Sequence, residues 1–218
     1  MTAVERMRFG PLTVAFDQRV LRPRPWTLAQ AEWAAELSPG LPEGTILELA
    51  AGAGHIGLAA AILTGRRLVQ VDLSQAACAW AAANAEAAGV ADAVEVRCGR
   101  FGDPVRADER FPLVIADPPY VPTGEVGRFP ADPRLAIDGG PDGLGVVTEC
   151  LAAAAAHVTR DGAVLLQARG EAQARDALAG RHGLVVVDVR AFADDRAVAL
   201  ARPTPVTSAP GARPSMHA

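Results

Sequence analysis

Short apolar runs alternate along this chain with alanine-rich stretches of helical character, and this alternation constrains the fold more than any other feature. Helix-like stretches follow several of the runs, and this order is typical of a parallel sheet with helices on both faces. The last two runs leave little room for a helix between them and are expected to form a hairpin. The strand-like runs are 45–49, 67–72, 94–97, 113–116, 163–167, 184–189 and 197–201. The helix-like stretches are 27–37, 58–63, 75–89, 145–157 and 171–180.

Length and composition indicate one globular α/β domain. The chain has 218 residues, half of them apolar, which is enough for a substantial core. A formal net charge of −4 weighs against a dedicated nucleic-acid binder. We expect an Arg- and Pro-rich N-terminal arm over residues 1–26, the folded domain over 27–202, and a disordered tail over 203–218.

The cysteines and the hydropathy favour a cytoplasmic protein. Cys78, Cys98 and Cys150 are far apart in sequence, so they predict neither a disulfide framework nor a zinc site, and we expect three small buried side chains. No metal is expected. The N-terminus lacks a secretory signal, and no run approaches the ~18 apolar residues of a membrane span.

The sequence AAGAGHIG after the first strand predicts a ligand-binding turn. Gly52, Gly54 and Gly57 have the spacing of a dinucleotide loop, and Asp72 follows at the distance suited to a ribose hydroxyl contact. The pattern also fits other adenosine ligands. Glu48, just before the loop, would repel a pyrophosphate but would accept a hydrogen bond from an ammonium group. An adenosine ligand with an amino-acid tail is therefore favoured over NAD.

The fourth strand ends abruptly at the sequence Asp117-Pro118-Pro119-Tyr120. Two prolines stop the sheet and hold their neighbours rigidly. Residue 117 and the carbonyl of Pro118 can each accept one N–H of a planar amide or amine, while Tyr120 stacks on its face. Such a nitrogen is a poor nucleophile, so orientation and polar stabilisation favour its attack. The motif therefore predicts transfer of a group to a planar nitrogen.

These motifs together resemble class I S-adenosylmethionine-dependent methyltransferases, and most closely the release-factor glutamine N5-methyltransferase group of the HemK/PrmC type. The resemblance rests on PRPWT, ILELAAGAG, VDLSQAACAWAAANAEAAGV, LVIADPPYVP and RLAIDGGPDGL, and it runs from about Arg22 to Arg202. It implies a Rossmann-like sheet of seven mostly parallel strands whose last strand is antiparallel. It also implies an enzyme with S-adenosyl-L-methionine as cofactor.

The resemblance assigns roles to individual residues. Asp117, Pro118 and Tyr120 would be catalytic, and with Pro119 they would bind the acceptor. Glu48 would lie near the cofactor's amino group. The other residues expected at the cofactor are Ala50, Ala51, Gly52, Ala53, Gly54, Asp72, Leu73, Arg100, Phe101 and Asp117.

Three functions stay open at this point. The preferred one is methylation of a protein glutamine, as in a release factor carrying a GGQ loop. Asp117 stands where the glutamine group has Asn, and D-P-P-Y also resembles DNA adenine and rRNA guanine amino-methyltransferases, so a nucleic-acid base is the alternative acceptor. Arg100, where many relatives carry an acid, supports a third possibility, a non-catalytic binding subunit. A small activating partner, a monomeric or weakly dimeric state and no membrane association complete these expectations.

A few other residues have plain structural interpretations. His55 follows the glycine loop and is expected to be structural. The side chains of Arg22, Arg24, Arg128 and Arg134 could form a basic rim around the pocket, although a solvated surface is the favoured interpretation.

Overall fold

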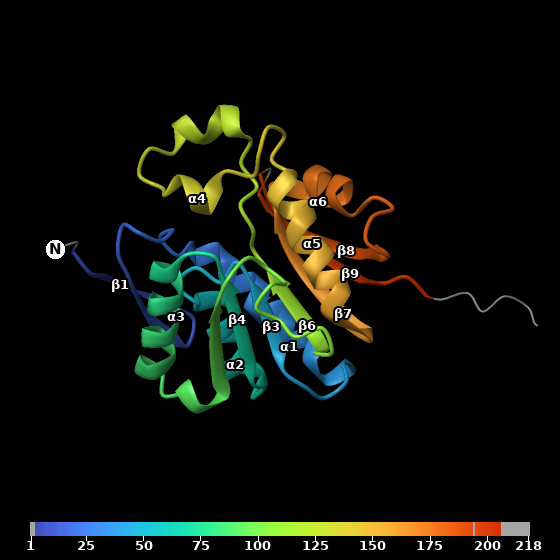
Figure 1. Ribbon diagram of the computed structural model, residues 1–218, viewed down its shortest axis with the longest axis horizontal. Coiled ribbons are helices and arrows are strands. Elements are labelled where there is room, and N and C mark those ends of the chain that lie inside the picture. The colour runs from blue at the N-terminus through green and yellow to red at the C-terminus, as the bar shows by residue number, and fades with distance from the viewer. Residues whose placement is uncertain (1–2, 194, 206–218) are drawn as a thin grey trace, which may run out of the picture.

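The computed structural model describes residues 3–193 and 195–205 and shows a seven-stranded sheet between two layers of helices (Figure 1). Its strands lie in the order β5-β4-β3-β6-β7-β9-β8. The first five are parallel, and β9 runs antiparallel to both of its neighbours, which confirms the predicted sheet and its terminal hairpin. The bounds are β3 Ile46–Leu49, β4 Leu68–Asp72, β5 Val94–Cys98, β6 Phe111–Ala116, β7 Val158–Ala168, β8 Leu184–Ala193 and β9 Arg196–Pro203.

Helices cover the two faces of the sheet in separate groups. One face packs against α1, α2 and α3, and the other against α5 and α6. The α-helices are α1 Leu28–Leu37, α2 His55–Thr64, α3 Gln75–Ala87, α4 Arg134–Ile137, α5 Gly145–His157 and α6 Gly170–Leu178. The 3-10 helices are η1 Pro25–Thr27, η2 Ser38–Gly40, η3 Ala91–Ala93 and η4 Thr123–Arg128.

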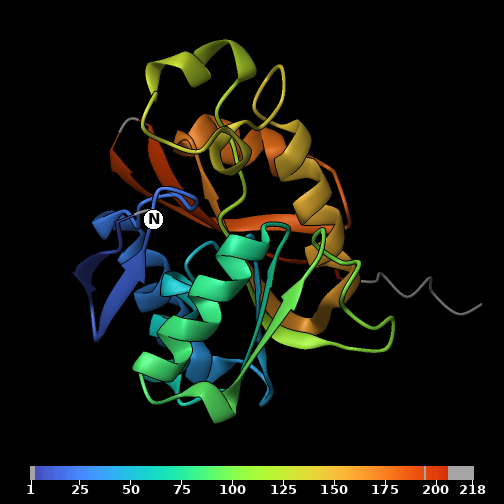
Figure 2. The ribbon, with the colours of Figure 1, turned by 60° about the vertical axis from the view of Figure 1, so that its left-hand side comes forward.

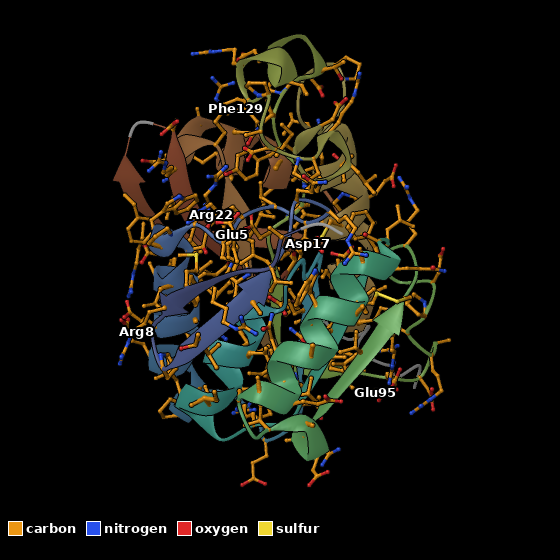
Figure 3. The ribbon with its side chains drawn as sticks, turned by 90° about the vertical axis from the view of Figure 1, so that its left-hand side faces the viewer. Glu5, Arg8, Asp17, Arg22, Glu95 and Phe129 are labelled. Carbon is orange, nitrogen blue, oxygen red and sulfur yellow. A yellow bond between two sulfur atoms is a disulfide. The ribbon has the colours of Figure 1, made fainter. Side chains whose placement is uncertain are left out.

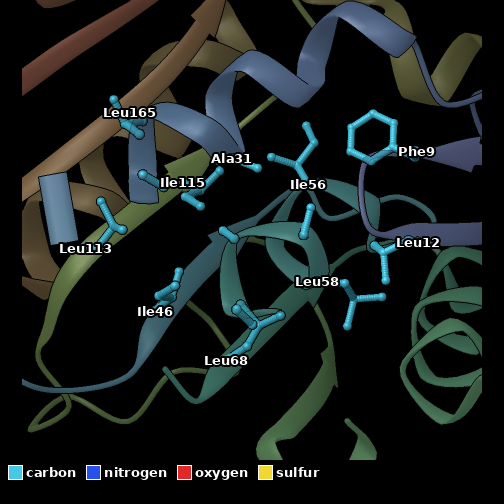
Figure 4. Packing of buried hydrophobic residues seen from close by; sticks show 14 of the residues in the cluster. Phe9, Leu12, Ala31, Ile46, Ile56, Leu58, Leu68, Leu113, Ile115 and Leu165 are labelled. Carbon is cyan, nitrogen blue, oxygen red and sulfur yellow. The ribbon is translucent and has the colours of Figure 1, made fainter. Parts of the chain in front are cut away.

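The strands divide their side chains between two cores, as a buried sheet requires. Ile46, Leu113 and Leu165 point to the side of α1 and α2, where Figure 4 shows them packed with Ile56 and Ala31. Their strand neighbours point the other way, toward α5 and α6. The apolar runs of the sequence are continuous because both faces of each strand are covered.

The order of the strands places a cleft at the carboxyl ends of the central strands β3 and β6. The chain builds β3, β4 and β5 outward in one direction and then returns to the other side of β3 with β6. The segments that leave β3 and β6 therefore diverge at the carboxyl ends of these strands, where open α/β sheets bind ligands. The glycine loop follows β3, and Asp117 follows β6.

Part of the N-terminal arm forms a hairpin, which the sequence analysis did not predict. Strands β1 (Glu5–Phe9) and β2 (Leu12–Phe16) pair antiparallel, and their apolar side chains are buried in the core of α2 and α3. The side chain of Asn84 on α3 accepts a hydrogen bond from the Ala15 amide (2.8 Å) and donates to the Ala15 carbonyl (2.9 Å). The sequence analysis missed this hairpin because its five-residue strands lie in a segment dominated by Arg and Pro.

The expectation of three separate buried cysteines is wrong. A disulfide joins Cys78 of α3 to Cys98 at the end of β5, with their Cα atoms 6.1 Å apart, and only Cys150 is a free buried thiol. Cys98 is exposed because β5 is the edge strand of the sheet. The sequence separation of 20 hides the proximity of the two cysteines, which the packing of α3 on β5 creates.

The remaining expectations concern the tail and the membrane. The predicted disordered tail, residues 203–218, begins within β9, and its part beyond residue 205 lies outside the described residues. Among the residues that are described, no helix is both long and apolar enough to cross a bilayer.

Candidate active site

A cavity of about 530 Å³ lies at the carboxyl ends of β3, β4 and β6. Most of the predicted cofactor residues border it. They are Ala50, Ala51, Gly52, Asp72, Leu73, Arg100, Phe101 and Asp117. The structure therefore brings together residues that are up to 67 positions apart in sequence. We call this 530 Å³ space the cofactor cavity.

The glycine loop has the backbone conformation that its residues predict. Gly52 (φ 55°) and Gly54 (φ 80°) are left-handed, and Ala50 adopts the same region (φ 59°) at some conformational cost. A Cβ at Gly54 would lie 2.8 Å from Nε2 of Gln70, so this position needs glycine for space as well. The loop thus presents its backbone to the cavity at Gly52, where a Cβ would meet no neighbouring atom.

Asp72 holds this loop and the start of α3 together. Its Oδ2 accepts from the Gly52 amide (2.8 Å) and its Oδ1 from the Ser74 amide (2.8 Å). Burial raises the pKa of Asp72, and these backbone hydrogen bonds oppose that rise. The carboxylate still borders the cavity, where its remaining lone pairs suit a diol such as that of a ribose.

Glu48, the residue expected near the cofactor's amino group, does not border the cavity. It lies beneath the glycine loop, where its Oε1 accepts from the Gly57 amide (2.8 Å) and its Oε2 from Nε2 of Gln70 (2.5 Å). Burial raises the pKa of Glu48 to about 7. Any side chain at Gly57 would collide with this carboxyl group, which explains the third glycine. Ala53 and Gly54 also lie behind the cavity wall.

Phe101 and Arg100 form the far end of the cofactor cavity. Phe101 has a left-handed backbone (φ 36°) after β5 and borders the cavity. The guanidinium of Arg100 lies 5.8 Å from the Phe101 ring centroid and donates to Glu149 on α5 (2.8 Å from Nε). Leu73 on the neighbouring wall is 48% exposed. This end of the cavity therefore offers apolar surface to a flat group.

A second cavity of about 490 Å³ lies on the other side of the Asp117-Pro118-Pro119-Tyr120 turn, and we call it the acceptor cavity. Pro118 and Tyr120 border only this cavity, whereas Asp117 and Pro119 border both. The two spaces therefore meet at Asp117, the residue that directly follows β6, and at Pro119. This arrangement suits transfer between two ligands held on either side of one turn.

Burial dominates the electrostatics of the turn. It raises the pKa of Asp117 to about 7, and it also raises the pKa of Tyr120 above its usual range. Tyr120 is therefore a neutral phenol at ordinary pH, which suits an aromatic face and not a base. Asp117 as a whole is half-buried and borders both cavities.

The segment GGPDGL braces this turn from behind. The amide of Val121 donates to the Ile137 carbonyl (2.9 Å), and the amide of Gly139 donates to the Val121 carbonyl (2.8 Å). A Cβ at Gly139 would lie 2.8 Å from the Pro119 carbonyl oxygen. Small residues are thus required for the close approach of the two segments.

Residues 123–138, which lie in sequence between the Asp117 turn and the GGPDGL segment, project beyond the strand ends (Figure 2). We call them the cap segment, and they contain η4 and α4. Figure 3 shows Phe129 on this projection, and its side chain borders the acceptor cavity. Leu135 of α4 borders the cofactor cavity and is 62% exposed. The cap segment therefore forms walls of both cavities, which its sequence did not reveal.

The N-terminal arm supplies another wall that the sequence analysis did not assign. Arg19 and Val20 border the cofactor cavity, and Leu21 borders both cavities. The guanidinium of Arg19 donates a hydrogen bond to the carboxylate of Asp17 (Nε to Oδ2, 2.9 Å). This contact holds the pKa of Asp17 well below its usual range. Only the PRPWT motif in the arm carried a signal for function, and its residues 24–27 border the acceptor cavity.

His55 borders the cofactor cavity but has the structural contacts expected of it. Its ring lies edge-on to Phe9 (centroids 4.8 Å apart), and its Nε2 is 3.4 Å from Oγ1 of Thr27. Burial lowers the pKa of His55 to about 4, so the ring is neutral at ordinary pH. It joins the hairpin and the arm to the first turn of α2.

Comparison with known proteins places the chain in a family. The model of a methyltransferase domain matches residues 46–127. The chain is 34% identical over 196 residues to a release factor glutamine methyltransferase of Mycolicibacterium smegmatis, covering 85% of this chain and 67% of that protein. A protein of the same description from Gloeobacter violaceus is 32% identical over 162 residues, covering 72% of this chain. The chain spans only 56% of that relative's length.

Two further likenesses agree with this placement. A ribosomal protein uL3 glutamine methyltransferase of Bradyrhizobium diazoefficiens is 35% identical over 127 residues, covering 56% of this chain and 40% of that protein. The crystal structure of a ribosomal protein L11 methylase from Lactobacillus delbrueckii subsp. bulgaricus has the same fold, with a TM-score of 0.63 at 16% identity over 87% of this chain and 84% of that one. The chain therefore belongs to the release factor glutamine methyltransferase family, the HemK/PrmC-type group of class I S-adenosylmethionine-dependent methyltransferases.

Proposed function

We propose that the chain is an N-methyltransferase that transfers a methyl group from S-adenosyl-L-methionine to the side-chain nitrogen of a protein glutamine, of the release-factor type. The observation that carries the proposal is the meeting of the cofactor and acceptor cavities at Asp117 and Pro119. The relatives named for glutamine methylation of a release factor and of a ribosomal protein support the acceptor class. Because both named acceptors belong to the translation machinery, we place the activity in the cytoplasm.

The residues of the cofactor cavity fit S-adenosylmethionine. Asp72 offers carboxylate oxygens to the ribose hydroxyls, Gly52 allows close approach of the backbone, and Phe101 with Leu73 offers apolar surface to the adenine. When bound, the cofactor supplies an electrophilic methyl group on a sulfonium. The contact to its amino group stays unassigned, because Glu48 is occupied beneath the loop.

The acceptor residues would orient the amide nitrogen and stabilise its developing positive charge. The carboxyl group of Asp117 and the carbonyl of Pro118 each accept one N–H, which turns the nitrogen lone pair toward the cofactor cavity. Tyr120 supplies a flat face for the planar amide. The bound cofactor would supply the methyl group to this nitrogen, and its sulfur would keep the electron pair of the carbon–sulfur bond. The nitrogen then releases its proton.

A nucleic-acid base is the alternative acceptor, and the charges around the acceptor cavity argue against it. Four arginines border this cavity, but each has an acidic partner within the described part of the chain. Arg24 pairs with Asp132 (2.6 Å), and both Arg128 (3.0 Å) and Arg169 (2.9 Å) pair with Glu125. The fourth, Arg196, lies 3.5 Å from Asp195. Such a rim offers little unbalanced positive charge to a phosphate backbone.

The test is transfer of labelled methyl groups to candidate acceptors. Release factors carrying a GGQ loop, matched variants with the loop glutamine replaced, and total RNA are each incubated with enzyme and labelled cofactor. We expect label only in the release factor with its glutamine intact. Label in RNA would favour the alternative acceptor. If no acceptor takes up label and calorimetry shows no cofactor binding, the non-catalytic interpretation is correct.

Two expectations about partners stay predictions. One is a small activating partner, and the other is a monomeric or weakly dimeric state. Adding the same release factor with and without a cell extract tests the first, and light scattering tests the second.

A further inference from the structure

Gln173 joins two walls of the acceptor cavity although it borders neither cavity. It lies in the first turn of α6, half-buried between this helix and the turn that follows β6. Its Oε1 accepts from the Arg169 amide (2.7 Å), and its Nε2 donates to the Tyr120 carbonyl (3.0 Å). One side-chain amide thus uses its acceptor and its donor on backbone groups of two segments 49 positions apart.

The Tyr120 carbonyl has little room to move. A Cβ at Gly143 (φ 77°) would collide with the Tyr120 carbonyl oxygen and would lie 3.0 Å from Nε2 of Gln173. The bare backbone of Gly143 therefore closes one side of this carbonyl while the amide of Gln173 binds it. Loss of the amide would leave a partly buried carbonyl oxygen without a donor, which favours rearrangement of the turn.

The hydrogen bond from the Arg169 amide to Gln173 fixes the backbone of Arg169, which belongs to another wall of the acceptor cavity. Arg169 ends the stretch that leaves β7, and its guanidinium pairs with Glu125 in η4 of the cap segment (2.9 Å). Both Arg169 and Tyr120 border the acceptor cavity. The Gln173 side chain therefore links the body of the sheet to the catalytic turn and, through Arg169, to the cap segment.

We propose that Gln173 is a positioning residue of the acceptor site. It fixes Tyr120 relative to Arg169, so that the N–H acceptors at Asp117 and Pro118 stay aligned with the cofactor cavity. The catalytic meaning of this role rests on the proposed function, but the mechanical role does not. A residue that merely starts α6 would need only the hydrogen bond to Arg169, because Tyr120 belongs to a different segment.

Hydrogen exchange measured by mass spectrometry tests the mechanical role without any substrate. Gln173→Leu removes both hydrogen bonds at nearly constant volume, and Arg175→Gln on the same helix is the control, since it loses only an exposed pair with Glu171. We expect exchange in segments 118–128 and 139–146 to become roughly tenfold faster in Gln173→Leu, with segment 49–58 unchanged. Unchanged exchange in 118–128, or equal acceleration throughout the chain, would overturn the proposal.

Kinetics with the acceptor that the wild type methylates test the catalytic role. A misplaced acceptor turn is expected to lower kcat roughly tenfold to a hundredfold in Gln173→Leu and to raise KM for the acceptor. Affinity for S-adenosylhomocysteine, measured by calorimetry, should stay within about twofold, because no residue of the cofactor cavity changes. Equal losses of kcat and cofactor affinity would indicate general damage and contradict the role.

Gln173→Glu separates the two hydrogen bonds. Its carboxylate keeps an acceptor for Arg169 but places an oxygen against the Tyr120 carbonyl. Protonation at low pH restores a donor, so its kcat relative to wild type should recover as the pH falls, whereas that of Gln173→Leu should not. A constant ratio would refute the Tyr120 contact. If no acceptor is methylated by the wild type, the proposed function fails, while the exchange experiment still decides on Gln173.

Discussion

Replacement of Asp117 by Asn should make the protein more stable at high pH while leaving turnover largely intact. Asp117 borders both cavities, and within the described residues no side chain donates a hydrogen bond to its carboxyl group. Burial raises its pKa from 3.8 to about 7. Asn has nearly the same shape and keeps a carbonyl oxygen as acceptor, but it never ionises.

The sign of the effect follows from linkage. Because the pKa of Asp117 is raised in the folded state, its protonation favours folding. This contribution to the free energy of unfolding is fully present below pH 3.8 and is lost as the pH rises through about 7. A shift of this size corresponds to at most about 4 kcal/mol, and water in the cavities reduces it. The Asn variant should therefore match wild type near pH 4 and exceed it by roughly 1–4 kcal/mol near pH 8.5.

Urea unfolding of both proteins at several pH values measures this difference. Titrating groups that Asp117 does not influence are common to both proteins and cancel in the comparison. The charge of Asp117 also raises the pKa of Glu48, so removing that charge favours the Asn variant at high pH in the same direction. At saturating cofactor, Asp117→Asn should keep kcat within about tenfold, or ~1.4 kcal/mol of barrier, and Asp117→Ala should lose roughly a hundredfold or more. A difference in stability that does not change with pH would refute the desolvation argument. An Asn variant as inactive as Ala would show that the charge itself is needed.

Three other substitutions test separate parts of the structure. Asp72→Ala should weaken S-adenosylhomocysteine binding by roughly tenfold or more in calorimetry, and unchanged affinity would remove Asp72 from the cofactor site. Asn84→Leu leaves the amide and carbonyl of Ala15 without partners and should lower the free energy of unfolding by roughly 2 kcal/mol or more in urea. Cys98→Ser opens the 20-residue loop closed by Cys78 and should cost about 3 kcal/mol under oxidising conditions. The same change should cost little in reducing agent, and an equal loss in both conditions would contradict the disulfide's role.

The strand pattern predicted the sheet because parallel strands buried on both faces read as continuous apolar runs. Even the terminal hairpin was predictable, since too few residues separate β8 from β9 for a crossover helix. The hairpin of β1 and β2 was not, because its burial depends on a surface that α2 and α3 create. The same reason hid the pairing of Cys78 with Cys98, which depends on how α3 lies across β5.

The candidate site was predictable where a local sequence carries the geometry. The glycine loop and the turn at Asp117 are local, and the structure places both at the expected cleft. The position of Glu48 beneath the loop was not predictable, because it depends on Gln70 of the neighbouring strand and on the start of α2. Arg19 and Leu135 border the cofactor cavity only because of tertiary packing, and no local sequence pattern around either residue predicts this position.

The most direct test of the central claim is to locate the transferred methyl group. A release factor methylated by this enzyme is digested, and tandem mass spectrometry reads the peptide that carries the GGQ loop. The account predicts one added methyl group on the side-chain nitrogen of that glutamine, absent when Asp117→Ala replaces the wild-type enzyme. A methyl group on any other residue, or none with wild-type enzyme that binds the cofactor, would contradict it.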